Sequence, residues 1–185
     1  MKVGEIVILY KNVDICDLDS IMKKGILSMD KCKNNNWGEG RRARNDTSVV
    51  YLFAPTNSQN SFPKYGTALL EVDTDAKENE MLENDIHKND YKEYITKSVA
   101  PQEIRKVIIP ELFKPYVEIP GDIPVNWCGL KADYYGETGL ESADNAVLER
   151  FSKTAALMDS SWFNFFRGKN ENRTLIDLYN IQYVF

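Results

Sequence analysis

A few charged residues in the first 105 positions could do chemistry. Arg41, Arg42 and Arg44 fall within four consecutive positions, and the planar fork of a guanidinium suits phosphate oxygens. Glu93 and Glu103 are acids beside apolar segments, and a glutamate is ionised at neutral pH. Each also has a plainer interpretation, because isolated arginines are usually solvated and Glu93 could face water from a strand. Residue types alone therefore indicate phosphate binding and a candidate carboxylate, without selecting a reaction.

Two aromatic residues have a spacing that suits ligand stacking. Tyr51 and Phe53 are separated by one residue, so they share one side of a strand. They could stack on a flat ligand, and two aromatic core residues would show the same spacing. Both interpretations stay open at this point.

Metal chemistry and nucleophile triads have little support. No P-loop, GxGxxG, HExxH or GxSxG motif occurs. The only histidine, His87, lies in a polar stretch, which favours a solvated loop residue. Cys16, Cys32 and Cys128 form no CxxC pair, so neither a disulfide framework nor a zinc site is indicated. We expect no metal site and interpret the cysteines as reduced thiols.

Composition predicts one domain over residues 1–185, because 43% apolar residues suffice for a core. No run approaches the roughly 18 apolar residues of a membrane span, and Met1–Tyr10 is too short and too acidic for a secretory signal. We therefore expect a cytoplasmic protein without membrane contact. The net charge of −5 argues against non-specific coating of nucleic acid, although basic residues concentrated in 22–44 could attract phosphates.

The first third of the chain predicts a strand, a short helix and a loop. Residues 4–10 are apolar and β-branched, which is typical of a buried strand. Asp17 is suited to the N-cap of a helix and Gly25 to its left-handed C-terminal residue, with apolar residues at helical spacing between them. Residues 29–46 are polar and rich in Asn and Gly, which predicts a surface loop.

The remaining pattern predicts an α+β fold. Strands are expected at residues 48–54, 67–72, 92–99, 104–109 and 174–185, and a second helix at 142–158. The first two of these strands could pair, and a turn at Ala100–Pro101 should separate the next two. The acidic residues 73–90 predict an irregular surface excursion with little core. We expect a mostly antiparallel or split sheet with short flanking helices.

Five local patterns occur in an order that resembles the DarT-like branch of the ADP-ribosyltransferases. They are Tyr10-Lys11, Asp17–Ile26, Arg41–Arg44, Tyr51–Asn57 and Glu93–Ile104. The resemblance covers the chain to about residue 110. It implies an ADP-ribosyltransferase-like split sheet.

This resemblance implies a catalytic role for Glu93. Cleavage of the bond between nicotinamide and ribose leaves positive charge on the sugar, which a nearby carboxylate stabilises more in the transition state than in the ground state. Glu93 could also accept a hydrogen bond from a ribose hydroxyl and help to deprotonate the acceptor. Arg42 and Arg44 are the further catalytic candidates. Glu103 takes the place of a structural glutamate in the family and ranks second to Glu93.

The resemblance also implies an NAD pocket made by Tyr10, Lys11, Asp14, Tyr51 and Phe53, with NAD as the co-substrate. Two of these residues depart from the family pattern, which commonly has Arg at Lys11 and His at Asp14. An ionised Asp cannot donate the hydrogen bond that a His donates. Either NAD is held differently or activity is reduced.

The implied function is transfer of ADP-ribose from NAD to a nucleic acid, DNA or RNA, by a toxin or phage-defence effector. We expect a monomer, and the resemblance would allow an inhibitor protein as a partner. The alternatives are a catalytically inactive binding module and ADP-ribosylation of a protein. An RNA 2′-phosphotransferase would need more basic pocket residues and a His near the first strand.

Overall fold

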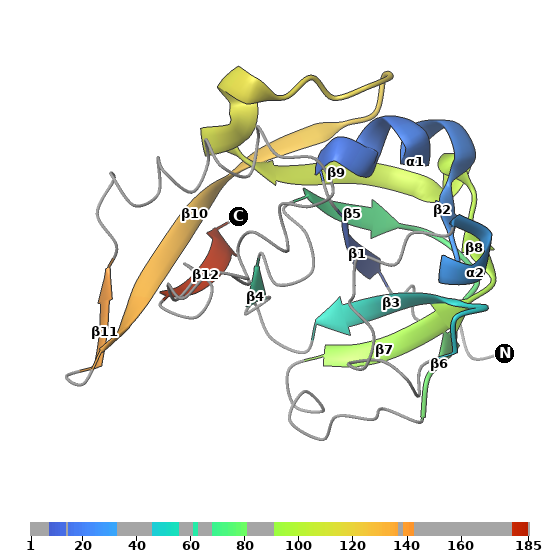
Figure 1. The fold of residues 1–185 in the computed structure, drawn as a ribbon, viewed down its shortest axis with the longest axis horizontal. Helices are drawn as coiled ribbons and strands as arrows, with labels where there is room; N and C mark the ends of the chain where they lie inside the picture. Colours follow the sequence, from blue (N-terminus) through green and yellow to red (C-terminus); the bar gives the residue numbers. More distant parts are fainter. Residues whose placement is uncertain are drawn as a thin grey trace, which may run out of the picture.

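The computed structural model describes residues 8–13, 15–32, 46–55, 61–62, 68–80, 91–136, 139–142 and 179–184. They form an α+β structure in which a large, mixed and mostly antiparallel sheet dominates and the helices are few and short (Figure 1). The predicted α+β class with a mostly antiparallel sheet is confirmed at this level.

The elements follow one another in chain order. The strands are β1 (Leu9–Val13), β2 (Ile26–Leu27), β3 (Val50–Pro55), β4 (Ser61–Phe62), β5 (Ala68–Val72), β6 (Lys77–Glu78), β7 (Tyr91–Thr96), β8 (Ser98–Val99), β9 (Ile104–Pro110), β10 (Val125–Gly136), β11 (Gly139–Ser142) and β12 (Tyr179–Val184). The helices are α1 (Leu18–Lys24) and α2 (Met29–Cys32), with 3₁₀ turns η1 (Ile15–Asp17), η3 (Pro101–Glu103) and η4 (Glu111–Tyr116).

The large sheet has the strand order β4-β12-β10-β9-β5-β1-β3-β7-β6, with β11 added to β10. β9 and β10 run parallel, whereas the other neighbours along this order are antiparallel. β2 and β8 form a separate pair. The register of β1 and β3 is given by one position, Tyr10 opposite Phe53. The central strands therefore meet β3, β7 and β6 at a narrow junction, called the β1–β3 junction below.

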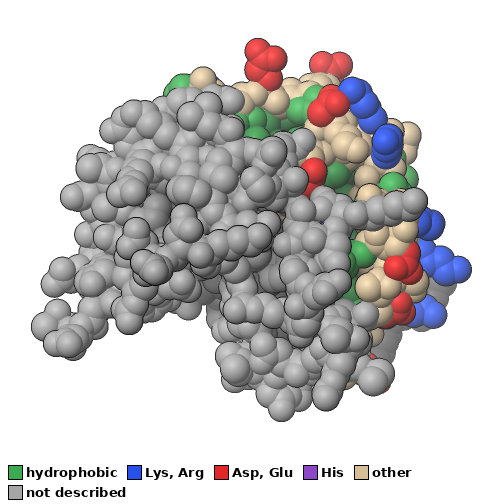
Figure 2. Space-filling view, in the orientation of Figure 1, with side chains coloured by type: hydrophobic (Ala, Val, Ile, Leu, Met, Phe, Trp, Pro, Cys, Tyr) green, Lys and Arg blue, Asp and Glu red, His purple; other side chains and the backbone are tan. Residues whose placement is uncertain are grey.

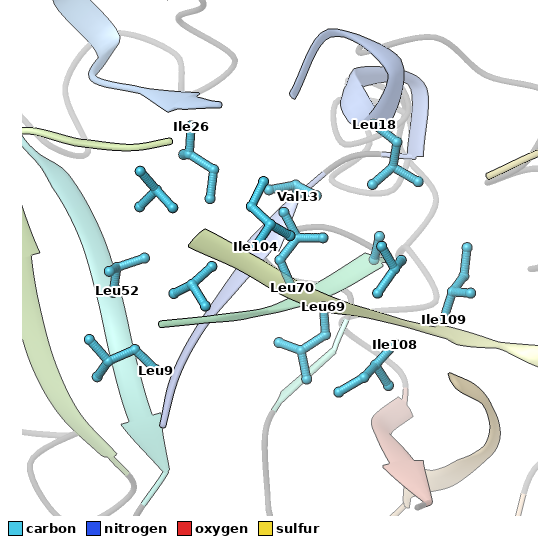
Figure 3. Close-up of a cluster of buried hydrophobic side chains, with 14 of the residues drawn as sticks. Leu9, Val13, Leu18, Ile26, Leu52, Leu69, Leu70, Ile104, Ile108 and Ile109 are labelled. Carbon is cyan, nitrogen blue, oxygen red and sulfur yellow. The ribbon is translucent and has the colours of Figure 1, made fainter. Parts of the chain in front are cut away.

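The core surrounds β1, β5 and β9. β5 reads as an almost continuous apolar run, ALLEV, because both of its faces are covered. Figure 3 shows Leu18 of α1 and Ile26 of β2 on one side of these strands, with Leu69 and Ile108 on the other. Phe113 of η4 is also fully buried. The sheet centre is thus the most densely covered part of the described structure.

The strand expected at residues 4–10 overlaps β1 only at Leu9 and Tyr10, and residues 4–7 lie outside the described residues. Other predicted strands are found with small shifts. Residues 48–54, 67–72 and 104–109 correspond to β3, β5 and β9. β3 and β5 lie in one sheet but do not pair, because β1 runs between them. Residues 92–99 divide into β7 and β8 on either side of Lys97, and the expected turn at Ala100–Pro101 leads into η3.

The predicted first helix is confirmed as α1. Asp17 precedes it as expected, but its side chain makes no capping hydrogen bond. Burial raises the pKa of the Asp17 carboxyl. Gly25 ends the helix as expected, but with φ +80° and ψ −175°, a positive φ with an extended ψ that favours glycine and differs from the left-handed helical conformation expected there. The loop expected at 29–46 is partly wrong, since α2 occupies its first residues.

The C-terminal half departs most from the prediction. The longest strand, β10, was not predicted, although it links β9 to β11 and β12. The helix expected at 142–158 lies outside the described residues, apart from Ser142, which ends β11. The closing strand expected at 174–185 is present as β12. No helix in the described segments is long and apolar enough to cross a membrane.

Candidate functional site

A lateral row of residues runs from the β6 edge of the sheet to β9 and contains three of the predicted site residues. Paired residues on neighbouring antiparallel strands lie on the same face of a sheet, so the registers define the row. We call it the Glu93 row. Its members, from the β6 edge inwards, are Asn79, Glu93, Phe53, Tyr10, Glu71 and Lys106.

Side-chain contacts support the row independently of the backbone register. The rings of Tyr10 and Phe53 lie with centroids 6.1 Å apart and planes tilted by 32°. Asn79 Nδ2 donates to Glu93 Oε1 at 2.7 Å. Lys106 Nζ lies 3.4 Å from Glu71 Oε2. The members of the row therefore lie on one face as well as at aligned backbone positions.

The Glu93 carboxylate is held at the β7 end of the row. Its strand pairs with β3 so that Glu93 lies opposite Phe53, and Glu93 is half-buried. Asn79, just beyond β6, makes two hydrogen bonds to Glu93. Its side-chain amide donates to the carboxylate, and its backbone N–H donates to the Glu93 carbonyl oxygen at 2.7 Å. Neighbouring strands are roughly 4.8 Å apart, so Tyr10, two strands away, is within reach of a ligand that also contacts Glu93.

Tyr10 is a neutral hydrogen-bonding group in the middle of the row. Burial raises the pKa of its phenol, and the negative charge of Glu71 raises it further. The half-buried Glu71 is in turn balanced by Lys106, whose side chain is 39% exposed. The row thus presents two glutamates, a lysine and a tyrosine with a protonated phenol on one face.

Tyr51 lies beside the row, and Lys11 does not. Tyr51 is two residues from Phe53 on β3 and so shares its face, while its hydroxyl donates to the Asp46 carbonyl oxygen at 3.1 Å. Lys11 follows Tyr10 on β1 and lies opposite Leu70, which is fully buried. Alternation along the strand places Lys11 on the opposite face from Tyr10.

Glu103 has a structural role. Its Oε1 accepts a hydrogen bond from Thr74 Oγ1 at 2.8 Å, and its Oε2 accepts one from the Ala100 backbone N–H at 2.6 Å. Its backbone carbonyl also accepts from the Asp73 N–H at 2.8 Å. The carboxylate therefore ties the turn before β9 to the chain after β5.

The remaining predicted residues, Asp14, Arg42 and Arg44, lie outside the described residues. Three members of the row were not predicted, namely Asn79, Glu71 and Lys106. Glu71 could have been identified as a candidate from the sequence, because it is the one charged residue in the apolar segment ALLEV. Asn79 had no such signal, since it lies in a stretch of polar residues.

Charge on the described surface is mixed. Figure 2 shows acidic and basic side chains near one another along the outer edge that includes α1. Exposed ion pairs contribute to this mixture, including Lys23–Asp19 at 2.6 Å and Arg105–Asp73 at 2.8 Å. Cys32 and Cys128 are free thiols. Within the described ranges, no cluster of three or more His, Cys, Asp or Glu residues could hold a metal ion.

Comparisons with models of protein families, with curated proteins and with solved structures found no match.

Proposed function

We propose that the chain is an NAD-dependent ADP-ribosyltransferase in which Glu93 is the catalytic carboxylate. The observation that carries the proposal is the row Glu93, Phe53 and Tyr10 on one face of three neighbouring strands. The nicotinamide ring of NAD is flat and positively charged, so it suits aromatic faces next to a carboxylate. The resemblance of the sequence motifs to the DarT-like enzymes supports the same assignment.

The proposed reaction is a substitution at the ribose carbon that carries nicotinamide. The bond between this carbon and the ring nitrogen breaks, and its electron pair leaves with nicotinamide. Glu93 stabilises the positive charge that develops on the sugar and accepts a hydrogen bond from a ribose hydroxyl. A nucleophile of the acceptor then bonds to the same carbon, and its proton passes to Glu93 or to water.

The other row residues have supporting parts in this proposal. Phe53 and Tyr10 would contact the nicotinamide ring, and Tyr51, on the same face as Phe53, would extend the aromatic surface. The β1–β3 junction is compatible with the split sheet of an ADP-ribosyltransferase, because two sheet halves can diverge on either side of one aligned position. Arg42 and Arg44 are proposed to act with Glu93, and Asp14 to belong to the NAD pocket, on the sequence resemblance, whereas Lys11, on the face opposite Tyr10, is not included in the proposed pocket.

We further propose a nucleic acid, DNA or RNA, as the acceptor, and a role as a toxin or phage-defence effector that an inhibitor protein could restrain. The arginines at 41–44 support this choice, because forked guanidinium contacts suit a phosphate backbone. Transfer to a protein and an inactive binding module are the alternative outcomes of the test below.

Nicotinamide release from NAD tests the proposal, measured without acceptor and with single-stranded DNA, RNA or cell protein. We expect release that one acceptor stimulates, and Glu93→Gln should lower it by about 100-fold or more, the usual cost of losing a transition-state charge contact. Glu78→Gln is the matched control, because Glu78 is an exposed acid on the neighbouring strand that pairs with Lys92.

The possible outcomes separate the alternatives. Stimulation by cell protein alone would favour ADP-ribosylation of a protein. NAD binding without release under every condition would identify a binding module. Full turnover by Glu93→Gln would show that the carboxylate assignment is wrong.

A further inference from the structure

Asn79 is connected to Glu93 in a way that reaches beyond strand pairing. Lys77 and Glu78 pair with Ile95 and Tyr94, and Asn79 continues this register opposite Glu93. Its backbone N–H donates to the Glu93 carbonyl oxygen at 2.7 Å, which fixes where the Asn79 side chain begins. Its side-chain amide then donates to Glu93 Oε1 at 2.7 Å. The two contacts together restrict the carboxylate as well as the backbone.

The contact makes the two oxygens of the carboxylate unequal. Oε1 accepts the amide hydrogen bond, whereas the structure gives Oε2 no hydrogen bond among the described residues. A glutamate side chain otherwise samples several rotamers, and ordering it has an entropic cost. The hydrogen bond from Asn79 fixes the Glu93 side chain before any ligand binds, so this entropic cost is not added on binding. Oε2 is left as the oxygen that can accept a hydrogen bond from a ligand.

The chemistry of the donor suits a carboxylate that must keep its charge. An amide donates a hydrogen bond without a positive charge, so it orients the carboxylate without neutralising it. The nearest lysine along β7 is Lys92, whose ammonium lies 3.7 Å from Glu78 instead. Lys92 and Glu93 alternate along the strand and so lie on opposite faces. Lys92 is therefore directed away from the Glu93 row, whereas Lys77 lies on the face of Asn79, two positions away along the chain.

We propose that Asn79 is a positioning residue that holds Glu93 Oε1 and directs Oε2 towards a ribose hydroxyl of the substrate. This inference rests on the proposed function of Glu93. It assigns no bond-making step to Asn79, because the proposed role is exerted through the carboxylate. A role confined to holding the β6 edge is the competing explanation, and the backbone hydrogen bond could serve that role without the side chain.

Steady-state kinetics of nicotinamide release by Asn79→Ala provide the first test. The substitution keeps the backbone hydrogen bond and removes the amide. We expect kcat to fall about 10- to 100-fold, the range associated with a catalytic group displaced by about 1 Å, while KM for NAD changes less than about threefold. Glu78→Gln, on the same edge strand, should leave both constants unchanged. An Asn79→Ala variant with the kcat of the unmodified protein would overturn the inference.

Asn79→Asp provides a readout that a structural role would not affect. The variant has nearly the same shape, but at neutral pH it places a second carboxylate against Glu93, and the two repel each other. At lower pH a proton shared by the pair restores one hydrogen bond. We expect the activity of Asn79→Asp, relative to the unmodified protein, to rise as pH falls. A ratio that is constant with pH would contradict positioning.

Two controls separate failure of this inference from failure of the proposed function. If Glu93→Gln abolishes release and Asn79→Ala does not, the proposed function stands and the positioning role is wrong. If the unmodified protein shows no Glu93-dependent release, the proposed function is wrong and the substrate part of the inference with it. The NMR signals of the Asn79 side-chain amide should still move in Glu93→Gln, and unchanged signals would contradict the contact itself.

Discussion

Two glutamates ten positions apart illustrate how little a residue type decides by itself. Both Glu103 oxygens accept hydrogen bonds, one from Thr74 in the chain after β5 and one from Ala100 in the turn before β9. Glu93 has only one oxygen held by Asn79 among the described residues. From the sequence, only the family resemblance ranked Glu93 above Glu103 as a catalytic candidate. The difference in hydrogen bonding could not be predicted, because the partners of the two carboxylates include residues 14 and 29 positions away.

Because of this difference, we expect Glu103→Ala to lower stability with little effect on the reaction, whereas Glu93→Gln should lower the rate of the reaction. The change removes two hydrogen bonds to a half-buried carboxylate, so unfolding should require about 1–3 kcal/mol less free energy. Nicotinamide release per folded molecule should stay within about twofold. Urea unfolding and kinetics below the transition measure the two effects. A large loss of kcat in fully folded Glu103→Ala would return Glu103 to the list of catalytic candidates.

At the scale of elements, the sequence predicted best where the signal was local. The boundaries of α1 follow from Asp17, Gly25 and the helical spacing between them, and β5 and β9 follow from compact apolar runs. β10 was missed because its definition is non-local: its first residues pair in parallel with β9 and its later residues pair with β11 and β12. Its sequence, VNWCGLKADYYG, has no regular alternation.

Gly25 gives a prediction at this scale. Its φ of +80° is unfavourable for any residue with a Cβ, and a Cβ at this site would collide with the Val99 carbonyl oxygen in β8. Gly25→Ala should therefore destabilise the protein by more than the roughly 1–3 kcal/mol of an unfavourable backbone conformation alone. Thermal unfolding measures the loss. Gly121→Ala is the matched control, because it has the same φ but nothing near its Cβ position.

At the scale of the whole molecule, the sequence predicted the α+β class but not the order of the strands. The Glu93 row requires β1 to lie between β5 and β3, and β6 to lie beyond β7. It also requires the register shift between β5 and β9 to fall after Glu71, so that Lys106 remains opposite it. These pairings join segments up to 61 positions apart, such as Tyr10 and Glu71, and no local pattern specifies them.

The pH dependence of global stability gives a further prediction. Burial raises the pKa of the Cys128 thiol from 9.0 to about 11. Below pH 9 the thiol is protonated in both states, and between pH 9 and 11 the unfolded chain loses its proton first. Stability should therefore fall over this window, by up to roughly 3 kcal/mol from this group. The raised pKa of Tyr10 acts in the same direction above its usual value of 10.0.

Urea unfolding of the unmodified protein and of Cys128→Ala, compared from pH 8 to pH 10.5, isolates the thiol. Other alkaline titrations are common to both proteins, so the difference in their unfolding free energies should change with pH only through Cys128. The stability of Cys128→Ala should decline less steeply. Parallel declines would mean that the thiol ionises alike in the folded and unfolded chains.

The Glu93 row has a practical consequence because it is assembled from six separate segments of the chain. No short peptide contains it, so a molecule that recognises it binds the folded chain and not the unfolded one. Through mass action such a molecule raises the free energy of unfolding, by about 2.7 kcal/mol at 100 times its Kd, and the melting temperature rises with it. A thermal-shift screen of dinucleotides, nucleotides and oligonucleotides can therefore identify what this face recognises before any reaction has been observed.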